Sequence, residues 1–328
     1  MRYPGTRLRR NRKSEAIRSM VRENQLSPDD FMVPLFITEG ENVKDEIPSM
    51  PGYFRYSLDR LNYELDEITE LGIRSVLLFV KVPEDKKDNK GTEPLRDDGL
   101  MQRAIKHIKK YYSDLFVMSD VALDPYSSYG HDGIVKDNEI VNDISAELLA
   151  QIALSHACAG VDMVAPSDMM DGRIDLIRKK LDQNGYENTG IMAYSVKYAS
   201  SFYGPFRDAL DSAPGFGDKK TYQMDPANSK EALVEARMDI QEGADIIMIK
   251  PGQPYLDILK AVSDELETPV SVYHVSGEYS MIKAAAEKGW LNENEVIMES
   301  LISFKRAGAS LIVTYFAKQA VKLLNESK

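Results

Sequence analysis

The sequence predicts an α/β fold of the (β/α)8 barrel class, with an extended N-terminal arm. Eight short apolar runs recur along the chain, and helix-length amphipathic segments lie between them. Nearly continuous apolar strands that alternate with helices are typical of a parallel sheet buried on both faces. Eight is the number of strands that closes this barrel, and 328 residues are a normal length for one.

Each expected strand is an apolar run bounded by turn signals. The strands span residues 32–37, 75–82, 115–123, 161–167, 190–196, 245–251, 270–276 and 311–316. Amphipathic helices are expected over residues 57–71, 98–112, 145–158, 229–242 and 278–288. Ser145 is expected to cap the first turn of the third of these helices. A doubly wound open sheet is the alternative fold, but no Gly-rich dinucleotide-binding pattern follows the first strand.

The N-terminal segment differs in charge from the rest of the chain. Residues 1–25 carry eight Arg or Lys and two Glu, a net charge of +6, so the remainder of this −11 protein carries −17. We therefore divide the chain into an arm for subunit contacts, residues 1–30, and a single barrel domain, residues 31–328. A nucleic-acid-binding arm is the alternative, but the acidic body would repel a phosphate backbone. A transit peptide is a third interpretation, although no long Ser-rich stretch follows the arm.

Composition narrows the class of protein further. No run approaches the roughly 18 consecutive apolar residues of a membrane span, and no secretion signal is evident. Cys158 is the single cysteine, so no intrachain disulfide forms, and a reducing compartment is favoured. These features predict a cytoplasmic protein without membrane or nucleic-acid partners.

Two connections are longer than packing requires. Residues 81–99 are polar, whereas residues 198–228 mix aromatic and basic side chains with glycine. Loops of this length are often lids or disordered insertions. The aromatic content of residues 198–228 favours a lid, because disordered segments are poor in such residues.

Two predicted strands carry a lysine at their carboxyl ends, which is where a barrel places its active site. They are Lys197 in "MAYSVKYAS" and Lys250 in "DIIMIKPG". Apolar surroundings lower the pKa of a lysine, and the neutral amine forms Schiff bases with ketones. If the two strands are neighbours, mutual repulsion lowers the pKa further. The structural alternative is that each lysine reaches solvent or pairs with a carboxylate.

Other strand ends are also polar, and the predicted lid carries Arg207 and Lys219. Together these groups predict a pocket with ketone-reactive amines, hydroxyl donors and cations that bind carboxylates, which suits small keto-acids. The polar strand-end residues are Ser167, Asp168, Tyr273, Ser276 and Tyr315.

The stretch "DVALDPYSSYGHDG", residues 120–133, follows the apolar run "LFVMS" and contains three aspartates and His131. Its spacing is that of a metal site, yet it contains no cysteine. Its aspartates are Asp120, Asp124 and Asp132.

These motifs are similar to a known family. "MAYSVKYASSFYGPFRDA", "MIKPGQPYLDI", "SVYHVSGEYSM", "APSDMMDGR" and "DVALDPYSSYGHDG" closely resemble the porphobilinogen synthase (5-aminolevulinate dehydratase) family over essentially the whole chain. The resemblance implies a (β/α)8 barrel whose N-terminal arm embraces a neighbour, in a homo-octamer. It implies the condensation of two 5-aminolevulinate molecules to porphobilinogen, with loss of two waters, in tetrapyrrole synthesis.

The resemblance also implies roles for single residues. Lys250 matches the lysine that forms a Schiff base with one substrate, Lys197 the lysine that binds the other, and Asp120 a carboxylate near the reacting amines. At position 219 the family often has arginine, and lysine keeps the charge but loses the bidentate fork. Substrate-binding positions are expected at Tyr203, Phe206, Arg207, Lys219, Gln223, Ser167, Tyr273, Ser276 and Tyr315.

One departure from the family concerns metal. Zinc-dependent members have three cysteines where this chain has Ala122, Asp124 and Asp132, and thiolates are what hold zinc there. We therefore expect no active-site zinc. Members with aspartates resemble a magnesium-stimulated class, in which an allosteric or structural Mg²⁺ lies outside the active site near a helix glutamate, here Glu235. One carboxylate with several waters is normal Mg²⁺ coordination.

The mechanistic hypothesis needs no organic cofactor, because a protonated imine is itself the electron sink. Lys250 and Lys197 each capture a substrate ketone, and Asp120, Asp124 and Asp132 stabilise the cationic imines and transfer protons. The alternative function is a Schiff-base aldolase or lyase that acts on a keto-acid with one active lysine.

Overall fold

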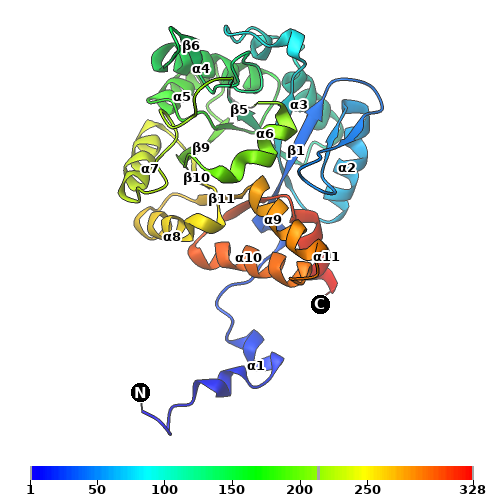
Figure 1. Ribbon diagram of the computed structural model, residues 1–328, viewed down its shortest axis with the longest axis vertical. Helices are drawn as coiled ribbons and strands as arrows, with labels where there is room; N and C mark the ends of the chain where they lie inside the picture. The colour runs from blue at the N-terminus through cyan, green and yellow to red at the C-terminus, as the bar shows by residue number, and fades with distance from the viewer. Residues whose placement is uncertain (1, 213–214, 327–328) are drawn as a thin grey trace.

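Eight parallel strands form a closed barrel in the computed structural model, which describes residues 2–212 and 215–326 (Figure 1). The strands are β1 (Phe31–Thr38), β4 (Ser75–Lys81), β5 (Phe116–Val121), β8 (Met163–Pro166), β9 (Gly190–Lys197), β10 (Ile246–Lys250), β11 (Val270–His274) and β12 (Leu311–Thr314). Neighbours in the chain pair with one another, and β12 pairs back with β1. The predicted barrel is confirmed, and the open-sheet alternative is wrong.

Helices surround the barrel and bury the outer face of its strands, as the near-continuous apolar runs require. The main helices are α2 (Leu58–Glu70), α3 (Leu100–Tyr111), α4 (Asn142–Cys158), α5 (Arg173–Gln183), α7 (Lys230–Glu242), α8 (Leu256–Glu265), α9 (Ser276–Glu287), α10 (Glu293–Ala307) and α11 (Ala317–Glu326). Among the described residues, none of the helices has the length and apolar character to cross a bilayer.

The expected role of Ser145 is wrong. Helix α4 begins at Asn142, one turn earlier than predicted, so Ser145 lies inside it. Its hydroxyl donates to the carbonyl of Val141 at 2.5 Å and accepts the backbone N–H of Ile134 at 2.8 Å. The side chain therefore ties α4 to the small hairpin of β6 (Ile134–Lys136) and β7 (Glu139–Val141) instead of capping the helix.

A second hairpin enlarges the barrel wall between β1 and α2. Strands β2 (Lys44–Glu46) and β3 (Phe54–Tyr56) pair antiparallel, and β3 also pairs with the end of β1. The hairpin was not predicted, because each of its strands is only three residues long. It extends the sheet beyond the circle of the barrel near the carboxyl end of β1.

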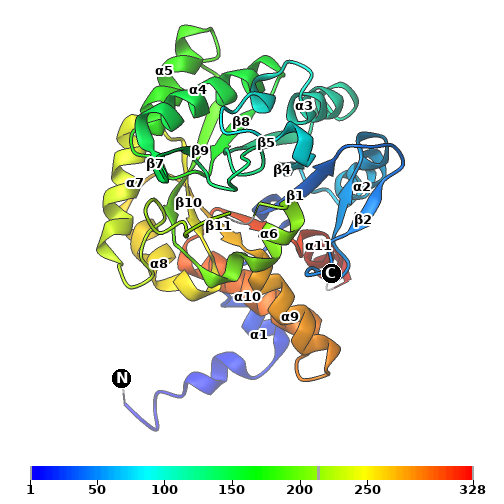
Figure 2. The ribbon, with the colours of Figure 1, turned by 45° about the horizontal axis from the view of Figure 1, so that its top comes forward.

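The N-terminal arm lies outside the barrel, which begins with β1 at Phe31 (Figures 1 and 2). It contains a short 3-10 helix, η1 (Leu8–Arg12), and α1 (Glu15–Met20), and neither has a buried side chain. Its predicted role in subunit contacts stays a prediction. Residues 327–328, at the end of the predicted barrel domain, lie outside the described residues.

The long connection after β9 lies over the open end of the barrel (Figure 2). It contains the 3-10 helix η5 (Ser201–Tyr203) and α6 (Gly204–Leu210); residues 213–214 are outside the described part. The ring of Phe206 meets that of Phe79 from the barrel, with centroids 5.1 Å apart. This position agrees with the predicted lid.

Candidate active site

Lys197 and Lys250 lie side by side at the open end of the barrel. They are the last residues of β9 and β10, and the parallel register pairs them directly with each other. Both are buried, with exposed fractions of 5% and 4%. The expectation that the two lysines come from neighbouring strands is confirmed.

Four aromatic rings surround the Lys250 ammonium, which forms no direct ion pair among the described residues. Its Nζ lies 4.7 Å from the ring centroids of both Phe206 and Tyr273, and 5.1 and 5.2 Å from those of Tyr194 and Tyr203. Burial, with the positive charge of Lys197 second, lowers the pKa of Lys250 to about 7. A large fraction of its amine is therefore neutral and nucleophilic near neutral pH.

Lys197 has a more polar environment than Lys250. Its Nζ donates a hydrogen bond to the main-chain carbonyl of Ser167 and lies 3.9 Å from Oδ1 of Asp132. The pairing with a carboxylate, which the sequence left open, therefore applies to Lys197. The two amines are neighbours with different electrostatic surroundings.

The three aspartates of residues 120–133 meet at the same place. Asp120 lies near the end of β5, while Asp124 and Asp132 lie on the loop that follows, and none is more than 7% exposed. Burial and the nearby Asp124 raise the pKa of Asp120 to about 7. Although burial acts the other way, the charges of Lys197 and Lys219 lower the pKa of Asp132. Asp120 is thus suited to exchange a proton, and Asp132 to remain charged.

Lys219 reaches the aspartates from the lid. Its Nζ lies 2.9 Å from Oδ2 of Asp132 and 3.3 Å from Oδ2 of Asp124. Its expected role was to bind a substrate carboxylate; in this structure it forms ion pairs with the two buried aspartates. That substrate role stays a prediction, and it requires Lys219 to exchange partners when substrate enters.

The lid is also hydrogen-bonded to the aspartate stretch through His131. The imidazole contacts the hydroxyl of Tyr222 at 3.1 Å and the carbonyl of Phe216 at 3.0 Å. His131 therefore joins the two loops, and the spacing that resembled a metal site serves lid docking and charge pairing.

Several predicted substrate-binding groups surround the lysines. The hydroxyls of Tyr273 and Tyr315 lie 2.9 Å apart, and the hydroxyl of Tyr203 donates to the carbonyl of Lys250. The Oγ of Ser276 and the Oε1 of Gln223 are buried without a hydrogen-bond partner among the described residues. Buried polar atoms without partners are costly, so these two are suited to bind a ligand.

Arg207 and Phe206 are the predicted substrate-binding residues that are only half-buried. Arg207 lies on α6 of the lid, above the open end of the barrel. Its expected role in binding a substrate carboxylate stays a prediction.

Comparison with known proteins identifies the family. Residues 5–323 match the family model described as delta-aminolevulinic acid dehydratase. The chain belongs to the delta-aminolevulinic acid dehydratase family. It is 52% identical to the enzyme of that name from Halalkalibacterium halodurans, over 98% of each chain, and 52% identical to that of Bacillus subtilis, again over 98% of each.

A solved relative matches the fold closely. Delta-aminolevulinic acid dehydratase (porphobilinogen synthase) of Toxoplasma gondii, in complex with the reaction product porphobilinogen, has a TM-score of 0.97 and 51% sequence identity. The match covers 98% of this chain and 92% of that one. The resemblance drawn from the sequence motifs is confirmed.

Glu235, the expected magnesium ligand, lies away from the lysines. It is on α7, in a polar cleft of about 280 Å³ whose lining includes Asp171, Asp225 and Glu231. Carboxylate oxygens suit Mg²⁺, which keeps several waters, so the donor set fits that ion. Within residues 2–212 and 215–326, no three His, Cys, Asp or Glu side chains are gathered as a metal-binding group.

Two buried carboxylates, Glu278 and Asp239, support the site but were not among the predicted site residues. Glu278 accepts backbone N–H groups from Val275 at 2.6 Å, from Gly252 at 3.3 Å and from Gln253. It thereby fixes the turn after Lys250 to the start of α9. The position of Glu278 three residues into α9, after the strand-end sequence "VYHVS", was the available signal, because a helix-start glutamate often accepts backbone N–H groups.

Asp239 is the second such carboxylate. It forms a buried ion pair with Arg173, with Oδ1 2.9 Å from Nη1, while Nε of Arg173 lies 3.6 Å from Asp168. This network joins α7, which carries Glu235, to the loop after β8, which carries Ser167. Nothing in the local pattern of α7 indicates the partner of Asp239, since Arg173 is 66 residues away.

We predict that Schiff-base formation at Lys250 rises with pH through about pH 7. The protonated amine is unreactive, and a lowered pKa means that the neutral form predominates above it. The measurement is the rate of adduct formation with 4-oxopentanoate, a keto-acid without an amine, under cyanoborohydride, followed by mass spectrometry. Lys197→Met removes the neighbouring charge and should move the profile to higher pH. An unchanged profile in that variant would contradict the pairing.

We also predict that Glu278→Gln lowers kcat by about 10- to 100-fold, because displacement of the turn misplaces Lys250. The KM for substrate should change less, since the hydrogen bonds of Glu278 within the described residues come from backbone N–H groups. Steady-state kinetics and the pH profile of adduct formation check this. Glu287→Gln, an exposed change on the same helix, is the matched control. Equal loss in both variants would rule out a positioning role.

Proposed function

We propose that this chain condenses two molecules of 5-aminolevulinate to porphobilinogen, with loss of two waters, as a hydro-lyase of tetrapyrrole synthesis. The observation that carries the proposal is the pair of buried lysines at registered positions, in a chain 51% identical to a relative solved with porphobilinogen. A reaction that joins two identical ketones suits two neighbouring amines. A Schiff-base aldolase with one lysine gives no reason for the second.

The proposed reaction begins when the neutral amine of Lys250 attacks the ketone of one substrate and loses water to form an imine. Lys197 captures the second substrate in the same way, which accounts for the second water. Loss of a proton beside one imine gives an enamine, whose carbon attacks the other imine carbon. A substrate amine then displaces a lysine and closes the ring, and the other lysine leaves as the pyrrole becomes aromatic.

The carboxylates supply charge and proton transfer in this scheme. Asp120, with a pKa raised to about 7, accepts and returns protons at the imines. Asp124 and Asp132 balance the positive charge that imine formation generates. Substrate carboxylates would be bound by Ser276 and Tyr315 on one side, and by Arg207, Lys219 and Gln223 on the lid.

We predict that Lys250→Ala abolishes porphobilinogen formation, and that Lys197→Ala lowers it by at least about a thousandfold. Borohydride should trap substrate on two lysines of the unmodified protein, on one in each single variant and on none in the double variant. Peptide mass mapping gives the sites, and a colour assay gives the product. Lys260→Ala, an exposed lysine on α8, is the control. Trapping at full stoichiometry in the double variant would overturn the mechanism, and activity that survives loss of Lys197 would favour the aldolase.

We further propose that Glu235 holds an allosteric or structural Mg²⁺, with no zinc in the active site. Its support is the cleft of oxygen donors around Glu235, together with Ala122 at a position where zinc-dependent relatives have cysteine. The ion would supply positive charge beside α7, at one end of the network of Arg173 and Asp239. All chemical steps remain with the lysines and aspartates.

We predict that Glu235→Gln weakens magnesium binding at least about tenfold, because the cleft loses its central charged ligand. Equilibrium dialysis measures binding directly, and the magnesium dependence of activity gives a second measure. Glu242→Gln, at the last residue of α7 and outside the lining of the cleft, is the matched control. Loss of activity to a zinc-selective chelator would contradict the assignment of the metal.

We propose a cytoplasmic homo-octamer that assembles through the arm. The arm's net charge of +6 against −17 for the remainder, and its lack of buried side chains in η1 and α1, suit docking on a neighbouring barrel. The single cysteine, Cys158, suits a reducing compartment. The proposed partners are therefore other copies of this chain and the substrate, with no nucleic acid or membrane.

A further inference from the structure

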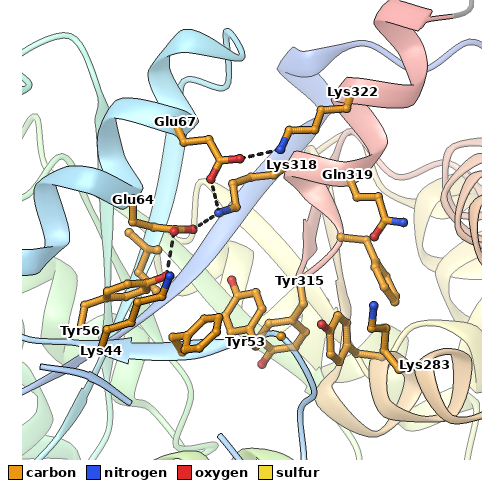
Figure 3. A pocket seen from close by; sticks show the side chains of 15 residues that line it. Lys44, Tyr53, Tyr56, Glu64, Glu67, Lys283, Tyr315, Lys318, Gln319 and Lys322 are labelled. Atoms are coloured by element: carbon orange, nitrogen blue, oxygen red, sulfur yellow. Dashed lines mark hydrogen bonds and ion pairs between the residues drawn. The ribbon is translucent and has the colours of Figure 1, made fainter. Parts of the chain in front are cut away.

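A second cavity lies behind Tyr315, on the outer side of the barrel wall (Figure 3). Its volume is about 390 Å³, within the range of roughly 300–1,000 Å³ typical of small-molecule sites. The hairpin of β2 and β3, α2, α9 and α11 form its walls. We call it the hairpin cavity.

Aromatic rings line one side of the hairpin cavity. The ring of Tyr53 packs edge-on against Tyr315, with centroids 4.9 Å apart, and Tyr279 packs against Phe316 at 4.5 Å. These rings offer flat apolar surface to a ligand that itself carries a ring. Tyr315 also contacts the active site, since its hydroxyl meets that of Tyr273, whose ring lies near Lys250. Tyr315 therefore lies between the hairpin cavity and the active site.

The charged residues of the hairpin cavity give it an excess of positive charge. Among the described residues, four lysines and two glutamates line it, which leaves a net charge of +2. Lys318 pairs with Glu64 and Glu67, and Lys322 pairs with Glu67 (Figure 3). The two glutamates are thus already neutralised by two of the lysines.

The other two lysines have no carboxylate partner among the residues that line the cavity. Within the described part of the chain, Lys44 forms no ion pair, and its Nζ lies 4.4 Å from the ring centroid of Phe54. Lys283 is paired with Glu293, 2.8 Å away and outside the lining, so a ligand would share its charge with that carboxylate. The Lys44 ammonium, which lies over an aromatic ring and not beside a carboxylate, can still form an ion pair with a bound anion.

We infer that the hairpin cavity binds a small organic anion whose carboxylates are carried on a flat ring. The aromatic wall would take the ring, and Lys44 and Lys283 would take the carboxylates. The small volume favours one ring over a macrocycle. Porphobilinogen is a pyrrole with two carboxylates and therefore has this chemistry. The choice of the chain's own product as the ligand rests on the proposed function.

Binding there would regulate the reaction through Tyr315. A ligand against the outer side of that ring changes how its hydroxyl is held beside Tyr273, and thus the affinity for a substrate carboxylate. Such coupling is reciprocal, so substrate would change the affinity for the product by the same factor. The hairpin cavity would then let accumulated product slow its own formation.

The test uses the full chain with its active site blocked by a reduced 4-oxopentanoate adduct on Lys250. Calorimetry with porphobilinogen should show one site per chain, and a benzene ring with two acetate groups should bind there too. Succinate, without a ring, and a porphyrin carboxylate, a macrocycle, should bind more weakly. If the adduct does not form, the proposed function fails, and the same titration is made on Lys250→Ala.

Lys44→Met and Lys283→Met should each weaken porphobilinogen binding about tenfold, the effect of one lost charge-assisted contact. Lys288→Met, beyond α9 and outside the cavity, is the control and should bind normally. In the unblocked enzyme, both cavity variants should show weaker product inhibition. Absence of binding to the blocked protein, equal binding by the cavity variants, or binding only after residues 1–25 are deleted would overturn the inference.

Discussion

The pairing of Lys197 with Lys250 across two parallel strands is the constraint on which the site depends. In a closed barrel, closure fixes the register of all eight strands together. The two lysine side chains are therefore held next to each other by the fold. Two buried ammonium groups side by side are unfavourable. Burial and the charge of Lys197 therefore lower the pKa of Lys250, which lies among aromatic rings, to about 7. The repulsion that destabilises the fold also favours the neutral amine of Lys250, which is the nucleophilic form.

The rest of the barrel mouth balances this arrangement. Three lysines, Lys197, Lys219 and Lys250, face three aspartates, and the charges are divided unequally between them. Because Lys219 comes from the lid, the position of the lid sets how much positive charge the aspartates face. If Lys219 binds a substrate carboxylate, as proposed, its exchange of partners would also change the charge around Lys197, which lies beside Asp132.

The sequence predicted those features that depend on local pattern. Apolar runs gave all eight strands, and a lysine directly after an apolar run marked the active site, because a barrel presents its strand ends at one face. The short strands β2 and β3 were not predictable, since three-residue strands carry no periodicity. The place of Glu278 at the start of a helix did indicate that it accepts nearby backbone N–H groups, but its bonds to Gly252 and Gln253, about 25 residues away, appear only in the fold. Lys219 was expected to bind a substrate carboxylate because it is a cation on the predicted lid. Its ion pairs with Asp124 and Asp132 were not predicted, since these aspartates lie about 90 residues earlier and only the fold brings them together. Glu235 came from family resemblance alone, as its helix position resembles any half-buried glutamate.

The most direct test of the central claim is an NMR titration of the Lys250 side chain, with ¹³C at the ε position, in the unmodified protein and in Lys197→Met. The account predicts a midpoint near pH 7 in the former and a clearly higher midpoint in the latter. A midpoint near the ordinary lysine value of about 10.4 in both proteins would contradict it, because neither burial nor the neighbouring charge would then activate the amine.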